Sequence, residues 1–171
     1  MSLDKNRIFR IVIISILFMT IMLAGKWYYG RNMLEVTKIV LQQKEYISNV
    51  DIERDGDDTI IHVTLRDVDN LKEVYSQILD TIERQFKEKS FTLKIVNNPG
   101  KTIESLYNDQ IQFIIYEAIQ TGEYTQMKTR LDKINIDNVT DEIKVFIDNK
   151  NLYLQIKNDK YSLYDVIKRD S

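Results

Sequence analysis

The chain has no cysteine and only one proline, one histidine and five glycines among its 171 residues. Without cysteine there is neither a disulfide framework nor a thiolate metal site. The lone imidazole, His62, has no nucleophile beside it in the sequence, and no glycine-rich run forms a phosphate cradle. These shortages remove most catalytic classes that a sequence can reveal. We expect no catalytic residue, no cofactor and no bound metal ion.

The strongest hint of a metal site is the acidic run 51–56, DIERDG, which has the alternating carboxylates and the glycine of a calcium loop. The match then fails, because Asp58 stands where a hydrophobic residue closes such a loop and His62 stands where its bidentate Glu belongs. The flanking residues also alternate as strands rather than as helices. The run is better interpreted as a solvated hairpin tip.

Charge is unevenly distributed along the chain. Residues 1–31 carry five Lys/Arg against one Asp, a net charge of +4. The remainder carries 19 Lys/Arg against 25 Asp/Glu, a net charge of −6, and the two parts give the −2 of the whole chain. A mildly acidic domain lacks the basic face that neutralises phosphates, so we expect no nucleic-acid partner.

The dominant feature of the sequence is the uncharged stretch from Ile11 to Gly25, IVIISILFMTIMLAG. A helix needs about 20 apolar residues to cross a bilayer, so fifteen alone are too few. The flanks lengthen the segment to 8–29, because Trp and Tyr favour the membrane interface and an Arg near a helix end reaches the headgroups. We therefore expect a short basic tail over 1–10 and a membrane anchor over 11–29. The expected interface residues are Arg10, Lys26, Trp27, Tyr28 and Tyr29.

Two other interpretations of this stretch stay open. A basic tail and a 15-residue apolar core also fit a cleaved signal peptide, although Met22 occupies a position before Ala24 that favours a small residue. A helix buried in a protein core is the second, and it leaves the apolarity all round the helix unexplained.

The orientation of the anchor follows from its flanking cations. Lys5, Arg7 and Arg10 precede the stretch, whereas Lys26 and Arg31 follow it. This slight bias favours an N-terminus in the cytoplasm and a domain outside it. The reverse orientation stays open.

Hydrophobic periodicity predicts an α+β fold for the rest of the chain, a small mixed domain behind the transmembrane helix. A first subdomain over 32–96 has the expected order α-β-β-α-β, and Gly30 is its only flexible joint to the anchor. The expected elements are a helix over 33–47, strands over 50–53 and 61–65, a helix over 71–86 capped by Asp67 or Asp69, and a strand over 91–95.

A second subdomain over 101–171 has the expected order α-α-β-β-α and is expected to pack against the first. Its expected elements are helices over 101–121 and 124–134, with Gly122 ending the first of them, strands over 143–147 and 152–156, and a last helix over 161–169. Residues 49–75 and 142–167 share one order of strands, acidic turn and helix. This shared order indicates either an internal repeat or only the turn residues that any hairpin prefers.

The α-β-β-α-β order of residues 33–96 is similar to that of the small ring-building domains of bacterial secretion and sporulation assemblies. The resemblance is one of pattern, and no family-specific motif accompanies it.

The leading functional hypothesis is a single-pass, membrane-anchored, non-enzymatic assembly or interaction domain of a bacterial cell-envelope complex. Its expected partners are the lipid bilayer, through residues 8–29, and either another protein or a second copy. The alternative is a membrane-tethered ligand-sensing or substrate-binding domain, which needs a pocket between the two halves. A hydrolase built from acidic pairs such as Asp57-Asp58 and Asp141-Glu142 is the third hypothesis, but both pairs fall where turns and caps explain them.

Overall fold

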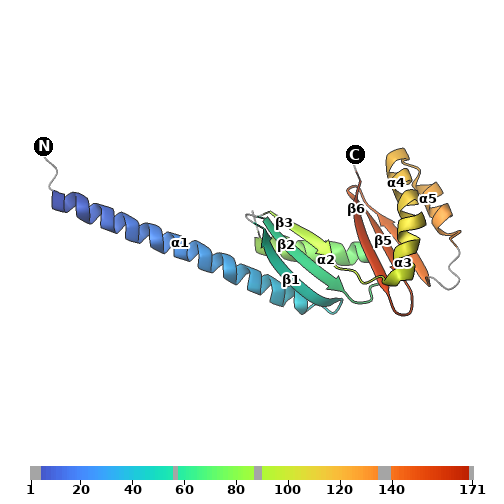
Figure 1. The fold of residues 1–171 in the computed structure, drawn as a ribbon, viewed down its shortest axis with the longest axis horizontal. Coiled ribbons are helices and arrows are strands. Elements are labelled where there is room, and N and C mark those ends of the chain that lie inside the picture. Colours follow the sequence, from blue (N-terminus) through green and yellow to red (C-terminus); the bar gives the residue numbers. More distant parts are fainter. Residues whose placement is uncertain (1–4, 56–57, 87–89, 135–139, 170–171) are drawn as a thin grey trace.

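The computed structural model describes residues 5–55, 58–86, 90–134 and 140–169. These residues form five α-helices, one π-helical turn and two three-stranded sheets, which confirms the mixed α+β class (Figure 1). The elements are α1 (Lys5–Gln42), β1 (Ile47–Asp55), β2 (Asp58–Leu65), α2 (Leu71–Phe86), β3 (Phe91–Ile95), α3 (Gly100–Leu106), η1 (Tyr107–Ile111), α4 (Gln112–Thr121), α5 (Tyr124–Leu131), β4 (Glu142–Ile147), β5 (Asn151–Lys157) and β6 (Ser162–Lys168).

Helix α1 joins the apolar stretch to the domain without a break (Figure 1). Its 38 residues rise about 57 Å. The sequence predicted a separate helix over 33–47 and a joint at Gly30, and both expectations are wrong. Gly30 lies within α1, where a glycine costs only about 1 kcal/mol relative to alanine. The helix ends at Gln42, and a tight turn, in which the Ile47 N–H bonds to the Lys44 carbonyl, leads into β1, where Ile47 pairs with Leu65.

The first sheet has the strand order β1-β2-β3, with β1 antiparallel and β3 parallel to β2. Alternation places Ile61, Val63 and Leu65 of β2 on the buried face, against α2 and the end of α1. The predicted strands and the predicted helix over 71–86 are confirmed. The expected caps are not, because the side chain of Asn70 accepts the N–H of Glu73 in the first turn of α2.

The second sheet is antiparallel with the order β4-β5-β6. The sequence predicts a helix over 161–169. This prediction is wrong, because the segment forms β6, the third strand of this sheet. The Asn158 side chain accepts the N–H groups of Lys160 and Tyr161, and this turn sends the chain back along β5. Pairing with β5 then outweighs the helix-like spacing of the apolar residues in this segment. The two halves consequently differ in element order, so the order gives no support to an internal repeat.

The predicted helix over 101–121 is present as three consecutive pieces, α3, η1 and α4. The π-helical turn η1 inserts between the two α-helical parts. Gly122 ends α4 in the left-handed conformation, with φ of 76°, and its N–H bonds to the Ala118 carbonyl, as the sequence predicted.

Two apolar cores share the second sheet. One core contains the buried face of the first sheet, α2, the end of α1 and one face of β5 and β6. The other contains α3, α4, α5 and the opposite face of β5. Helix α2 therefore lies between the two sheets, and Tyr75 on α2 meets Tyr153 on β5 edge-on, with ring centroids 5.7 Å apart.

The packing predicts which substitutions destabilise the domain. Ile82→Ala removes a fully buried side chain of α2 and should lower the free energy of unfolding by about 2–5 kcal/mol. His62→Ala, on the uncovered face of β2, should cost less than about 1 kcal/mol. Urea unfolding of residues 33–171 compares the two variants. Equal losses would show that the uncovered face of the sheet is under constraint.

Candidate functional site

Apolar side chains cover all sides of the N-terminal part of α1. Every residue from Phe9 to Gly25 is exposed, and the large apolar side chains among them are between 48% and 67% exposed. Arg10 is exposed on the same segment. The other expected interface residues, Lys26, Trp27, Tyr28 and Tyr29, continue the helix, but their side chains lie outside the described part of the chain.

Within the described residues, no helix combines the length and the apolarity needed to cross a membrane. The transmembrane helix that the sequence predicts over 11–29 is therefore not supported by the structure.

His62, Asp51 and Glu53 lie on the uncovered face of the first sheet. His62 Nε2 is 3.7 Å from Glu53 Oε2 and has no hydrogen-bond partner among the described residues. Asp51 lies opposite His62 on β1 and is 3.8 Å from Lys38 of α1. In the part of the chain that the structure describes, no three His, Asp or Glu side chains gather as metal ligands.

Gln155 joins the two halves of the domain. It is fully buried on β5, and its Nε2 donates to the Val68 carbonyl at 2.8 Å. Its Oε1 accepts the N–H of Leu71 at 3.3 Å, which is one of the N–H groups that the first turn of α2 cannot satisfy internally. The second sheet thus holds the linker from β2 to α2 in place.

Asn97 makes a second junction at the edge of β6. Its side chain donates to the Tyr164 carbonyl and accepts the Tyr164 N–H, both at 2.8 Å, as a neighbouring strand would. Asn98 forms a single β-bridge with Ser162 beside it. Gly100 then turns the chain at φ of 63°, where an added Cβ would lie 2.8 Å from the Tyr161 ring.

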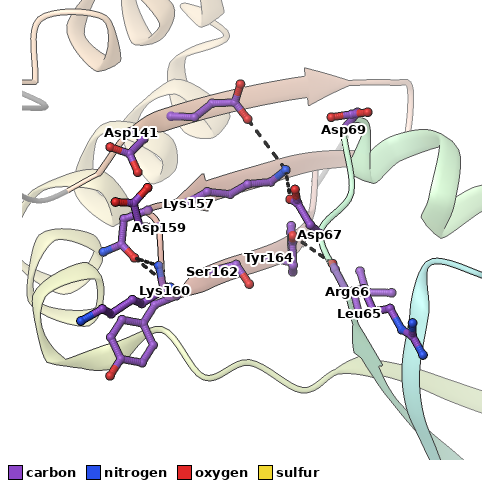
Figure 2. A pocket seen from close by; sticks show the side chains of 13 residues that line it. Leu65, Arg66, Asp67, Asp69, Asp141, Lys157, Asp159, Lys160, Ser162 and Tyr164 are labelled. Atoms are coloured by element: carbon purple, nitrogen blue, oxygen red, sulfur yellow. Dashed lines mark hydrogen bonds and ion pairs between the residues drawn. The ribbon is translucent and has the colours of Figure 1, made fainter.

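A cleft of about 610 Å³ opens where the two halves meet (Figure 2). Its floor is the end of β5 and the start of β6, and its walls are the β2–α2 linker and the residues before β4. Five carboxylates and three cations line it, so a cationic or neutral polar ligand suits it better than an anion. The charged lining residues are Arg66, Asp67, Asp69, Asp141, Glu142, Lys157, Asp159 and Lys160.

Carboxylates of the cleft itself neutralise one of its three cations, Lys157. Lys157, whose side chain is only 14% exposed, pairs with Asp67 and lies 4.0 Å from Glu142 Oε2 (Figure 2). The other oxygen of Glu142 is 2.6 Å from Lys144 Nζ. These ion pairs link β4, β5 and the β2–α2 linker, and they leave Lys157 poorly suited to act as a nucleophile.

A second hollow of about 380 Å³ lies behind the same linker. It shares Asp67 and Asp69 with the cleft and is lined on its far side by Tyr46. Burial raises the pKa of Tyr46, and its hydroxyl is buried without a hydrogen-bond partner among the described residues.

The β4–β5 turn carries a compact hydrogen-bond network. Asp148 accepts the N–H groups of Lys150 and Asn151 at 2.8 Å and the Tyr153 hydroxyl at 2.7 Å. Burial alone would raise the pKa of Asp148, but these hydrogen bonds and nearby Lys72 lower it below its usual 3.8. Burial, together with Asp148, raises the pKa of Tyr153 to about 12.

Sequence patterns gave no signal for the residues that form the junction. Gln155 alternates with Leu154 and Ile156 as an outward residue of a hairpin would, and it is the β2–α2 linker and the start of α2 that meet it on that face. Asn97 stands in the segment 97–100, NNPG, whose turn-forming residues predict only the end of a strand. Their partners are separated from them by 67 to 87 positions in the chain, beyond any local pattern.

The chain matches no protein-family model, no curated protein and no solved structure.

The junction predicts a specific loss of stability for Gln155→Leu. The change leaves the Val68 carbonyl and the Leu71 N–H buried without partners, at a cost of about 1–3 kcal/mol each. The matched control is Gln77→Leu on the exposed face of α2. Urea unfolding should show a large loss for the first variant and almost none for the second. Equal stability of the two would mean that the buried amide contributes nothing to the junction.

The Asp148 network predicts a stability difference that depends on pH. Because the pKa of Asp148 is lower in the folded protein than its usual 3.8, its contribution is present above pH 3.8 and is lost as pH falls further. Asp148→Asn should therefore be less stable than the unmodified protein at neutral pH, and the two should converge at lower pH. Unfolding curves between pH 7 and pH 2 measure this, with Asp80→Asn on exposed α2 as control. A difference that persists unchanged to pH 2 would contradict the proposed role of the carboxylate.

Proposed function

We propose that this chain is a single-pass, membrane-anchored, non-enzymatic interaction domain of a bacterial cell-envelope complex. The observation that carries the proposal is the exposed apolar surface of α1 from Phe9 to Gly25. A soluble monomer rarely leaves so large a continuous apolar surface in water, because each buried Å² of apolar area is worth about 25 cal/mol. A bilayer covers such a surface on all sides at once, which a single partner helix does not.

The direction of the anchor completes this proposal. With three cations before the apolar stretch and two after it, the N-terminus lies in the cytoplasm and the domain lies outside. The domain begins soon after the membrane, because Met33 and Leu34 of α1 already pack against the first core.

A role in assembly is supported by the chemistry of the domain surface. Lys157 of the cleft is engaged in ion pairs, and His62, the only imidazole of the sequence, lies on β2 and outside the cleft. Exposed aromatic residues, Phe113 and Tyr116 on α4 and Tyr161 after β5, are of the kind enriched at protein interfaces. These features favour binding over bond-making chemistry.

A second candidate function is the recognition of a small polar ligand in the cleft. Its supporting observation is the position of the cleft, between the two halves and with convergent charged groups. The acidic balance of the lining favours an organic cation or an amine-bearing molecule as the ligand.

The anchor predicts how the full chain behaves in cells. Bacterial membranes washed with alkaline carbonate should retain it. Ile14→Asp combined with Leu17→Asp should release it, because an Asp within a span costs about 2.5–3.5 kcal/mol. Ser76→Asp, on exposed α2, is the control and should stay in the membrane. Release of the unmodified chain by carbonate would refute the anchor.

Crosslinking of the full chain in intact bacterial cells distinguishes the two candidate functions. Discrete products of higher mass support an interaction domain. A strictly monomeric chain whose melting temperature rises with polyamines or amino acids would instead favour the ligand-binding cleft.

A further inference from the structure

Three polar side chains stand in one row across the uncovered face of the first sheet. Asp51 of β1 is paired with His62 of β2, and His62 is paired with Lys94 of β3, so the three side chains lie at the same level along the strands and point to the same face. Helix α2 and the end of α1 pack on the other face (Figure 1). Asp51 and Lys94 are exposed, and His62 is half-buried between them. The row therefore runs from a carboxylate on one edge strand to an ammonium group on the other.

The two end charges of this row do not neutralise each other within one chain. Asp51 and Lys94 are separated by two strand spacings, which amount to about 10 Å. Asp51 is 3.8 Å from Lys38, and Lys94 makes no ion pair within the described residues. Glu53, in the next row of β1, adds a second exposed carboxylate to the same edge. The face thus has an acidic edge at β1 and a cation with no counter-charge at β3.

This distribution of charge is complementary to itself. A two-fold axis that runs along β2, in the plane of contact between two such faces, places β1 of one copy opposite β3 of the other. Because Asp51 and Lys94 lie in one row on either side of β2, each then faces its opposite charge, and the contact contains the same ion pair twice. In the next row Glu53 faces Thr92, whose hydroxyl is a donor for the carboxylate, and Ile60 faces its own counterpart on the axis. An unrelated partner would not require this symmetric placement.

The direction of the two-fold axis also suits two anchored chains. Strands β1 and β2 run in roughly the same direction as α1 (Figure 1). An axis along β2 is therefore roughly parallel to α1, and the two α1 helices leave the contact at the same end. If the apolar stretch is embedded as proposed above, both copies enter one bilayer from the same side. The helices do not obstruct the contact, because α1 and α2 pack on the opposite face of each sheet.

We infer that the uncovered face of the first sheet binds the same face of a second copy of this chain, with Asp51 of each copy paired to Lys94 of the other. The inference rests on the proposed function as an interaction domain and names its partner. Two sheets that pack face to face lie about 10 Å apart, a gap that side chains from both faces fill. The charges also determine the orientation, because a two-fold axis across the strands through this row would place Asp51 opposite Asp51 and Lys94 opposite Lys94.

Reversal of the two charges tests the pairing in the full chain. Copies with two different tags are coexpressed, the membranes are dissolved in mild detergent, and one tag is captured. Asp51→Lys should recover its own second copy several-fold less well than the unmodified chain does, because Lys then faces Lys94. Lys94→Asp should show the same loss, because Asp then faces Asp51. Asp51→Lys coexpressed with Lys94→Asp should recover each other as the unmodified copies do, since both contacts again join opposite charges.

The mixed pair also shows that the two variants are folded, and Asp80→Lys on the exposed side of α2 is the matched charge reversal that should leave recovery unchanged. Three results would each overturn the inference: unmodified copies that do not recover each other, single reversals that recover themselves like the unmodified chain, and a mixed pair that recovers no better than either variant alone. Crosslinked products that contain a different protein and that neither reversal affects would refute the pairing of the two faces and leave the proposed interaction function intact.

Discussion

The arrangement of the whole domain depends on one buried amide. Gln155 projects from the central strand of the second sheet and satisfies two backbone groups of the segment that leads into α2. An unpaired backbone group in that position would cost about 1–3 kcal/mol, so the linker has little freedom to take another path. Helix α2 is then held between the two sheets, and the two apolar cores are placed back to back across the second sheet.

The same constraint shapes the cleft between the halves. Its walls are the linker that Gln155 holds and the strand ends that Lys157 ties to Asp67 and Glu142. At the β6 edge of the second sheet, Asn97 fixes β6 to the segment that follows β3. The relative position of the two halves is therefore set by hydrogen bonds and ion pairs at several separate places, in addition to apolar contact.

The elements that the sequence predicts correctly are those whose hydrophobic periodicity matches the burial of their side chains in the structure. The alternation through Ile61, Val63 and Leu65 and the stripe of α2 both follow from local spacing. Local spacing predicts a helix for the last strand because Leu163, Val166 and Ile167 also fit a helical period, and only the pairing with β5 makes this segment a strand. Gln155 and Asn97 escaped prediction because a polar residue in a strand or turn is usually solvated, and only a distant segment shows otherwise.

The uninterrupted backbone of α1 has a consequence for the tolerance of the chain to insertion and deletion. Each residue added between Gly25 and Met33 turns the domain by about 100° around the helix axis and lifts it by about 1.5 Å. The azimuth of the domain is thus coupled to the length of this short segment. A flexible linker would absorb such a change. In a continuous helix, the number of residues in the segment determines which side of the domain faces its neighbours.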